Sequence, residues 1–225
     1  MQKLKCFGPD QLEIVNNAVA MAEELVSNNY KMSASQWLGR RYDVKTLEEL
    51  KPEEIIDGPF AQIIRYKGQR KNTSLGSATY DFYKICLQDH TIRSTLETTR
   101  EIKLFPFSLY IIAHELIHIV RFSKFLQSFD ASAEERMAEE KRVHQRTHEI
   151  LQPIQLNGLK KVLDFYNDWR VPYEDLRTPW VNVGIGGLSG EIIFFDTPYA
   201  WQTLVDNDIK PDCFLLSGST SRWLF

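Results

Sequence analysis

Three residues that can do chemistry together lie within five positions of the chain. His114, Glu115 and His118 form an H-E-x-x-H pattern inside an apolar stretch. On a helix, residues four apart share a face, so both imidazoles can bind one tetrahedral ion. Glu115 then projects beside that ion, where its carboxylate can hold a water on the metal, take its proton during attack on a carbonyl and pass it to a leaving amine. The pattern therefore predicts a site for Zn²⁺.

The pattern is also uncommon by chance. With five histidines in 225 residues, a random sequence of this composition contains it on the order of once in a hundred times. The plainest alternative is a pair of hydrogen-bonded core histidines with Glu115 in an ordinary ion pair. Burial of a carboxylate and two imidazoles without an ion or other partners is costly, which favours the metal site.

A third ligand is expected on the next predicted helix, which Ser132 can cap and Pro153 ends. Glu140, His144 and His148 step by four and share one face of that helix, whereas Glu139 points about 100° away. Glu140 is the preferred third ligand. His144 is the alternative ligand.

An H-E-x-x-H helix, a preceding strand and a glutamate on a following helix resemble the zincin metallopeptidases, and more closely their gluzincin branch. The resemblance is to motifs alone and covers roughly residues 80 to 150. It implies a zinc-dependent peptidase with His114, His118 and Glu140 as ligands and Glu115 as base. In that branch an aspartate follows the glutamate by four residues and orients the first histidine, whereas this chain has His144 at that position.

Two further expectations follow from the same resemblance. The strand around Tyr83 to Gln88 is a candidate edge on which an extended peptide substrate pairs, with an ordinary core strand as the alternative. His148, Tyr166 and Tyr173 are candidates to donate a hydrogen bond to a tetrahedral oxyanion, and His148 is assigned a catalytic role. The metzincin extension of the motif is absent, since Arg121 and Lys124 replace its glycine and third histidine.

Hydrophobic spacing and turn residues predict the elements that must position these side chains. They are a helix from Pro9 to about Val26, short helices between 33 and 57 with Pro52 starting the second, strands at 61–66 and 80–94 with a bend or hairpin at Asp89-His90, a buried helix at 104–127, a helix at 132–153, a helix at 157–169, and two to four strands beyond.

This order of elements predicts an α+β protein of zincin-like fold, with a small mixed or antiparallel sheet packed on a buried active-site helix. Residues 1–225 are expected to form one domain. Its parts are N-terminal helices at 1–60, the strands and both ligand-bearing helices at 61–153, and a strand-rich C-terminal subdomain at 154–225.

The composition narrows the range of partners. A hydrophobic share of 43% supports a large core, and a net charge of −3 gives no electrostatic argument for nucleic acid or a membrane surface. The apolar stretch from Leu104 to Val120 is interrupted by charged and polar groups, and the N-terminus lacks a signal-peptide pattern, so a cytoplasmic location is expected. A peptide or protein is the expected substrate, and the oligomeric state is left open.

Two other functions compete with the peptidase. A non-catalytic protein could use the same histidines to hold zinc for structural or sensory purposes, with every coordination position filled by protein groups. Glu115-x-x-His118 is also half of a ferritin-like di-iron site, but the sequence has no second Glu-x-x-His. An open coordination position separates the enzyme from the structural site.

Overall fold

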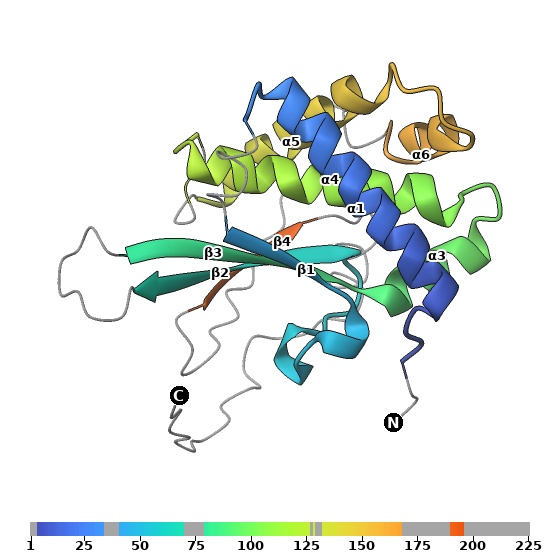
Figure 1. Cartoon of the computed structure of the whole chain (residues 1–225), viewed down its shortest axis with the longest axis horizontal. Coiled ribbons are helices and arrows are strands. Elements are labelled where there is room, and N and C mark those ends of the chain that lie inside the picture. Colours follow the sequence, from blue (N-terminus) through green and yellow to red (C-terminus); the bar gives the residue numbers. More distant parts are fainter. Residues whose placement is uncertain are drawn as a thin grey trace.

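The computed structural model describes residues 4–33, 41–69, 79–126, 128, 132–167 and 190–195. It confirms a mixed α+β architecture with a small mixed sheet. In chain order the elements are α1 (Pro9–Asn29), β1 (Arg41–Lys45), η1 (Leu47–Glu49), η2 (Pro52–Glu54), β2 (Ala61–Gln69), β3 (Thr79–Leu87), α3 (Asp89–Thr98), α4 (Leu104–Ser123), α5 (Ala133–Leu151), α6 (Leu159–Phe165) and β4 (Gly190–Phe195). Helices α1, α4, α5 and α6 lie on one side of the sheet (Figure 1).

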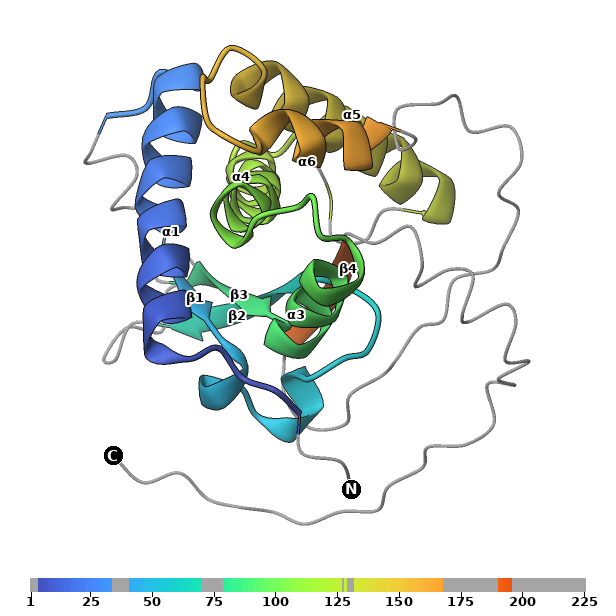
Figure 2. The same ribbon diagram turned by 90° about the vertical axis from the view of Figure 1, so that its right-hand side faces the viewer.

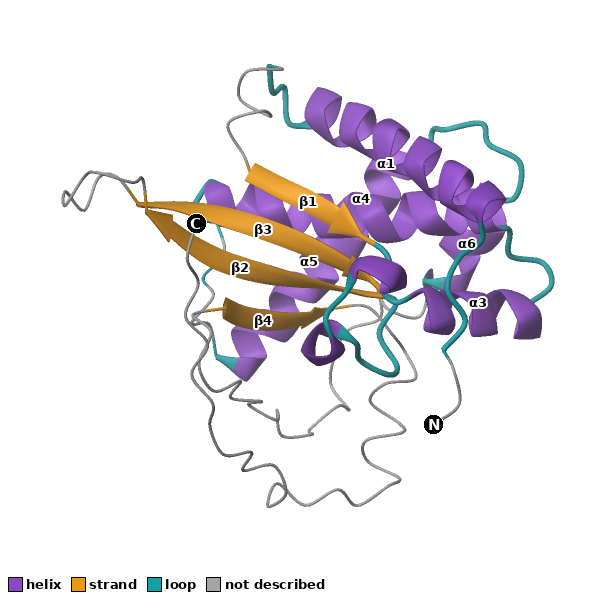
Figure 3. Ribbon diagram, turned by 60° about the horizontal axis from the view of Figure 1, so that its bottom comes forward, coloured by secondary structure: helices purple, strands orange, loops and turns teal. Residues whose placement is uncertain are grey.

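The sheet has the strand order β1-β3-β2-β4, with β1 parallel to β3 and the other pairs antiparallel. Figure 3 shows the four strands from the face opposite to the helices. Ile63 and Ile85 are paired neighbours, fully buried on the helical side. Because β3 pairs with β1 on one side and with β2 on the other, the prediction that the strand around Tyr83 to Gln88 is an edge for a substrate is wrong, and its alternative, an ordinary core strand, is confirmed.

Helix α4 occupies the centre of the molecule. Viewed along its axis, it is surrounded by α1, by α5 and α6, and by the sheet (Figure 2). Every residue of α4 from Pro106 to Val120 is buried, as its two opposed apolar faces predict. Ala18 and Ala22 of α1 are fully buried in the same core, and their small side chains permit close approach of a neighbouring helix.

α4 also has the length and hydropathy of a membrane-spanning helix, being 20 residues long with a mean hydropathy of 1.3 over an 18-residue window. However, 83% of that window is buried inside the protein. The apolar length of α4 is therefore accounted for by its place in the core.

The segment after β3 is a helix, where its β-branched residues predict a strand as far as Ser94. This prediction is wrong. The buried carboxylate of Asp89 accepts hydrogen bonds from the amides of Phe7 (2.9 Å) and Leu47 (3.0 Å), both remote in sequence. With Ile92 fully buried on the same helix, these long-range contacts outweigh the local β-propensity.

Residues 41–45 form a strand, which the prediction of short helices between 33 and 57 does not include. The short 3-10 helices η1 and η2 confirm the helices expected before residue 57, and Pro52 begins the second. Strand β1 precedes them, and its side chains from Tyr42 to Lys45 are all half-buried. The polar residues Arg41, Asp43 and Lys45 alternate with Tyr42 and Val44, which pack against the core, so this segment carries the period of two that identifies a strand.

Beyond residue 167 the structure describes only β4. It extends the sheet beside β2, with Ile193 opposite Ile63. The other predicted C-terminal strands and Tyr173 lie outside the described residues, and the proposed division into subdomains remains a prediction. Helix α6, from Leu159 to Phe165, confirms the helix expected after Asn157.

Candidate metal centre

Helices α4 and α5 carry all the residues of the candidate site. α4 begins after Lys103, and Pro106 lies in its first turn, where a missing N–H breaks no helical hydrogen bond. α5 begins at a capping box, in which the Ser132 hydroxyl accepts a hydrogen bond from the Glu135 amide (3.3 Å) and the Glu135 carboxylate accepts one from the Ser132 amide (2.7 Å). Both helix starts are therefore encoded locally.

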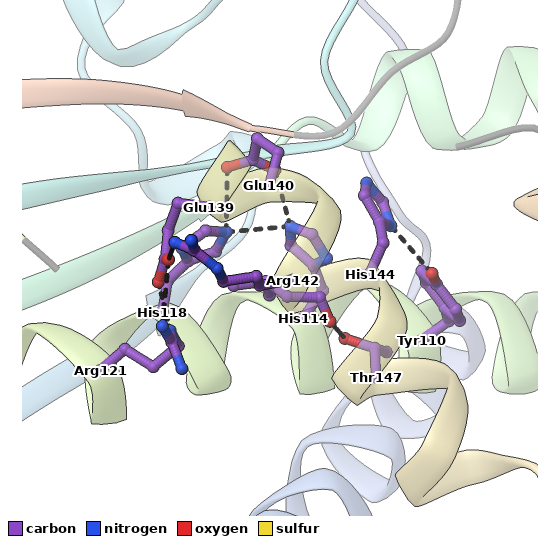
Figure 4. Close-up of polar contacts among 10 residues, drawn as sticks. Tyr110, His114, His118, Arg121, Glu139, Glu140, Arg142, His144 and Thr147 are labelled. Carbon is purple, nitrogen blue, oxygen red and sulfur yellow. Dashed lines mark hydrogen bonds and ion pairs between the residues drawn. The ribbon is translucent and has the colours of Figure 1, made fainter. Parts of the chain in front are cut away.

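The structure brings together His114, His118 and Glu140. The Nε2 atoms of the two histidines are 3.1 Å apart. The carboxylate of Glu140 lies across both, with Oε2 3.2 Å from His114 Nε2 and Oε1 3.1 Å from His118 Nε2 (Figure 4). One ligand atom from each residue falls within 4.8 Å of the other two, so this cluster could hold a metal ion.

The spacing and chemistry of these atoms fit zinc. Ligand atoms about 2.0 Å from a tetrahedral ion are about 3.3 Å from one another, close to the 3.1 Å between the two imidazole nitrogens. Two imidazoles and a carboxylate are also a donor set that zinc takes in catalytic sites. Both imidazoles are fully buried, and so are the two carboxylate oxygens of Glu140, whose side chain keeps 16% exposure through its other atoms.

Burial favours the uncharged forms of His114 and Glu140 in the cluster. It lowers the pKa of His114 well below its ordinary value, with further lowering by the nearby His144 and His118. It raises the pKa of Glu140 well above its ordinary value, and the adjacent Glu139 raises it further. A neutral imidazole is the form that binds metals, so His114 is already in its ligand state.

Glu115 is fully buried and is not one of the three clustered ligands. It lies seven residues before Phe122, and residues seven apart on a helix share nearly the same face. The ring of Phe122 stacks on Tyr83 of β3, with centroids 6.2 Å apart and planes at 11°. The ring of His118 also stacks on Phe122, with centroids 6.2 Å apart, so Glu115 lies on the face of α4 that adjoins the face of His118, next to β3.

His144 lies beside the cluster. Its Nδ1 is hydrogen-bonded to the Tyr110 hydroxyl at 2.9 Å, and its ring centroid is 4.3 Å from that of His114. Tyr166 stacks on Tyr110, with centroids 3.9 Å apart. Of the two third-ligand candidates, Glu140 is the one that the described structure groups with His114 and His118, and His144 contacts the first histidine from the side.

The proposed oxyanion donors lie further away. His148 is half-buried and lies eight residues after Glu140 on α5, which separates them by about 12 Å along the helix axis. Tyr166 is buried and stacked on Tyr110 rather than grouped with the three ligands. The catalytic role of His148 remains a prediction.

One residue of the site that the sequence does not identify is Glu139. It is 3% exposed, and its carboxylate forms a two-point ion pair with Arg121 of α4. Its Oε2 lies 3.0 Å from Arg121 Nη2 and 3.2 Å from Arg142 Nη1. The sequence spacing shows only that Glu139 lies off the face of α5 that carries Glu140, His144 and His148. Which residue of α4 it meets depends on how the two helices pack.

Comparison of the chain with known protein families, curated proteins and solved structures finds no match.

Proposed function

We propose that this protein is a zinc-dependent hydrolase, and specifically a metallopeptidase of gluzincin type that acts on peptide or protein substrates. The observation that carries the proposal is the convergence of His114, His118 and Glu140 from two helices onto one point. The preceding strands, the central H-E-x-x-H helix and the glutamate on the following helix also agree with a zincin-like arrangement.

In this proposal the two imidazoles and the Glu140 carboxylate would hold the zinc ion, which would act as a Lewis acid and lower the pKa of water toward 7. Glu115 takes a proton from the attacking water as its oxygen adds to the substrate carbonyl carbon. Glu115 then passes that proton to the amide nitrogen as the carbon–nitrogen bond breaks. A fully buried carboxylate next to a ligand, and not itself in the cluster, supports this role.

A structural or sensory zinc site is the second candidate, favoured by the complete burial of both imidazoles. Such a site normally has four protein ligands. The metal-binding group found among the described residues has three, all from α4 and α5. This supports the enzyme over the structural site, because a catalytic zinc needs a position that water can occupy.

Metal content tests the ligands. The purified full chain is expected to bind about one equivalent of zinc, and His114→Ala and His118→Ala are expected to lose it because each removes a ligand nitrogen. His90→Ala is the matched control, since His90 lies on α3 and pairs with Asp57 at 3.2 Å. Full zinc affinity in both ligand variants, measured by competition with a chelator, would overturn the site.

Cleavage of a mixed peptide library tests the chemistry. Glu115→Gln is expected to keep zinc and to lower turnover by about a hundredfold or more, because the amide cannot accept the proton. Glu149→Gln, a change on the exposed face of α5, is expected to leave turnover unchanged. If the zinc-loaded wild type cleaves no peptide the peptidase proposal fails, and if Glu115→Gln cleaves at the wild-type rate the base is wrong.

A further inference from the structure

Beside the three clustered ligands, α4 and α5 are joined by an ion pair to which no role has been assigned so far. Two nitrogens of the Arg121 guanidinium on α4 donate to the two carboxylate oxygens of Glu139 on α5. Arg121 Nε donates to Oε1, and Arg121 Nη2 donates to Oε2 at 3.0 Å. The Glu139 side chain is 4% exposed and that of Arg121 is 19% exposed. A two-point pair of this kind fixes orientation as well as distance, because the guanidinium and the carboxylate are both planar.

The position of this pair matters because of its neighbours in sequence. Arg121 lies three residues after His118, about one turn along α4, and Glu139 immediately precedes Glu140. Adjacent helical residues point about 100° apart, so fixing the side chain of Glu139 fixes the rotation of α5 about its axis. That rotation decides whether the Glu140 carboxylate lies between the two imidazoles, as Figure 4 shows.

We propose that Glu139 and Arg121 are positioning residues that hold Glu140 in register with His114 and His118. The inference rests on the proposed metal site and adds to it the contact that positions the third ligand, Glu140. At the far end of the interface the Tyr110 hydroxyl contacts His144 at 2.9 Å. The order of contacts shows that the helices are antiparallel, and the ion pair fixes the end next to His118.

The alternative is that the ion pair only stabilises the fold, as buried pairs elsewhere do. Glu54 provides the comparison within this chain. Its side chain is 3% exposed and pairs with Lys84 at 2.7 Å, and Lys84 and its paired neighbour Ile64 alternate along their strands with Ile63 and Ile85 of the core. Glu54 therefore lies on the opposite side of the sheet from α5, and Glu54→Gln removes a charge of similar burial from a place remote from Glu140.

The experiment compares Glu139→Gln, Arg121→Lys and Glu54→Gln in the whole 225-residue chain. Arg121→Lys keeps the positive charge but loses the planar two-point contact, and it is the variant to use if Glu139→Gln does not fold. Three quantities are measured for each: the zinc dissociation constant, the visible absorption spectrum of the Co²⁺ form, and the thermal midpoint without metal. The Co²⁺ spectrum responds to the number and arrangement of ligands, which a loss of stability alone does not change.

Glu139→Gln and Arg121→Lys are expected to weaken zinc binding about tenfold to a hundredfold, the range typical of residues that orient a ligand, and to alter the Co²⁺ spectrum. Glu54→Gln is expected to lower the thermal midpoint and leave both metal measurements at wild-type values. Wild-type zinc affinity and an unchanged Co²⁺ spectrum in both Glu139→Gln and Arg121→Lys would overturn the positioning role alone. A wild type that binds neither ion would overturn the metal site, and the positioning role with it.

Discussion

Burial acts in opposite directions on the pKa values of His114 and Glu140, and in both cases it favours the uncharged form. The pKa of His114 is lowered, so its contribution to stability is fully present above its ordinary value of 6.5 and is lost as pH falls from 6.5 through the lowered value. The pKa of Glu140 is raised, so its contribution is present below 4.5 and is lost as pH rises through the raised value. In the metal-free site His114 is therefore already in the neutral form that binds zinc, whereas burial favours the protonated form of Glu140, which does not.

This asymmetry predicts a proton coupled to zinc binding. Zinc requires the Glu140 carboxylate to be ionised, so binding must displace the proton that burial holds there. Zinc affinity is expected to rise with pH from 4.5 until pH passes the raised pKa of Glu140. Calorimetry in buffers of different ionisation enthalpy measures the proton released per zinc bound. Affinity that stays flat across this interval, with no proton release, would contradict the raised pKa.

The sequence identifies the residues of the cluster for a local reason. His114, Glu115 and His118 form a motif whose spacing matches a helix, and Glu140 follows from its phase with His144 and His148 on the next helix. The Glu139–Arg121 pair is beyond this reasoning, because it depends on the relative rotation of two helices that no local pattern records.

Among the elements, α4 and α5 are predictable because each carries its own signals. α4 has an apolar surface on two opposed sides, and α5 has a capping box at Ser132. β1 also carries a local signal, the alternation of Tyr42 and Val44 with polar residues, which the sequence prediction overlooked. α3 is not predictable in this way, because its form is set by remote contacts such as the hydrogen bonds of Asp89 to Phe7 and Leu47, while its local residues indicate a strand.

The cap of α5 offers a test at the level of the element. Ser132→Ala is expected to destabilise the protein by about 1 kcal/mol, because it removes the acceptor for the Glu135 amide at the start of the helix. Urea unfolding of the metal-free protein measures this change. Thr98→Ala is the control, since the exposed Thr98 hydroxyl only donates to carbonyls within α3. Equal unfolding free energies for Ser132→Ala and wild type would show that the capping box contributes nothing.

In the molecule as a whole, α4 and α5 have unequal support. α4 is enclosed by α1, α5, α6 and the sheet (Figure 2), whereas α5 has buried residues such as Val143 and Thr147 on one face and exposed residues such as Gln145 on another. The proposed zinc ion would join the enclosed helix to the peripheral one. Its removal is therefore expected to loosen α5 more than α4.

Removal of the metal gives a measurable form of this expectation. Zinc present at about a hundred times its dissociation constant stabilises the folded state by about 2.7 kcal/mol, so a chelator is expected to lower the thermal midpoint by about 5–10 °C in a protein of this size. His118→Ala should show no such shift, because it already lacks the site. Hydrogen exchange then shows which helix loses stability. Without zinc, the amides of α5 (133–151) are expected to exchange faster, while the amides of α4 (104–123) keep most of their protection. The reason is that the core around α4 does not depend on the ion. Equal loss of protection in both helices would mean that the ion supports the whole core, as a structural zinc does, and would favour the non-catalytic function over the peptidase.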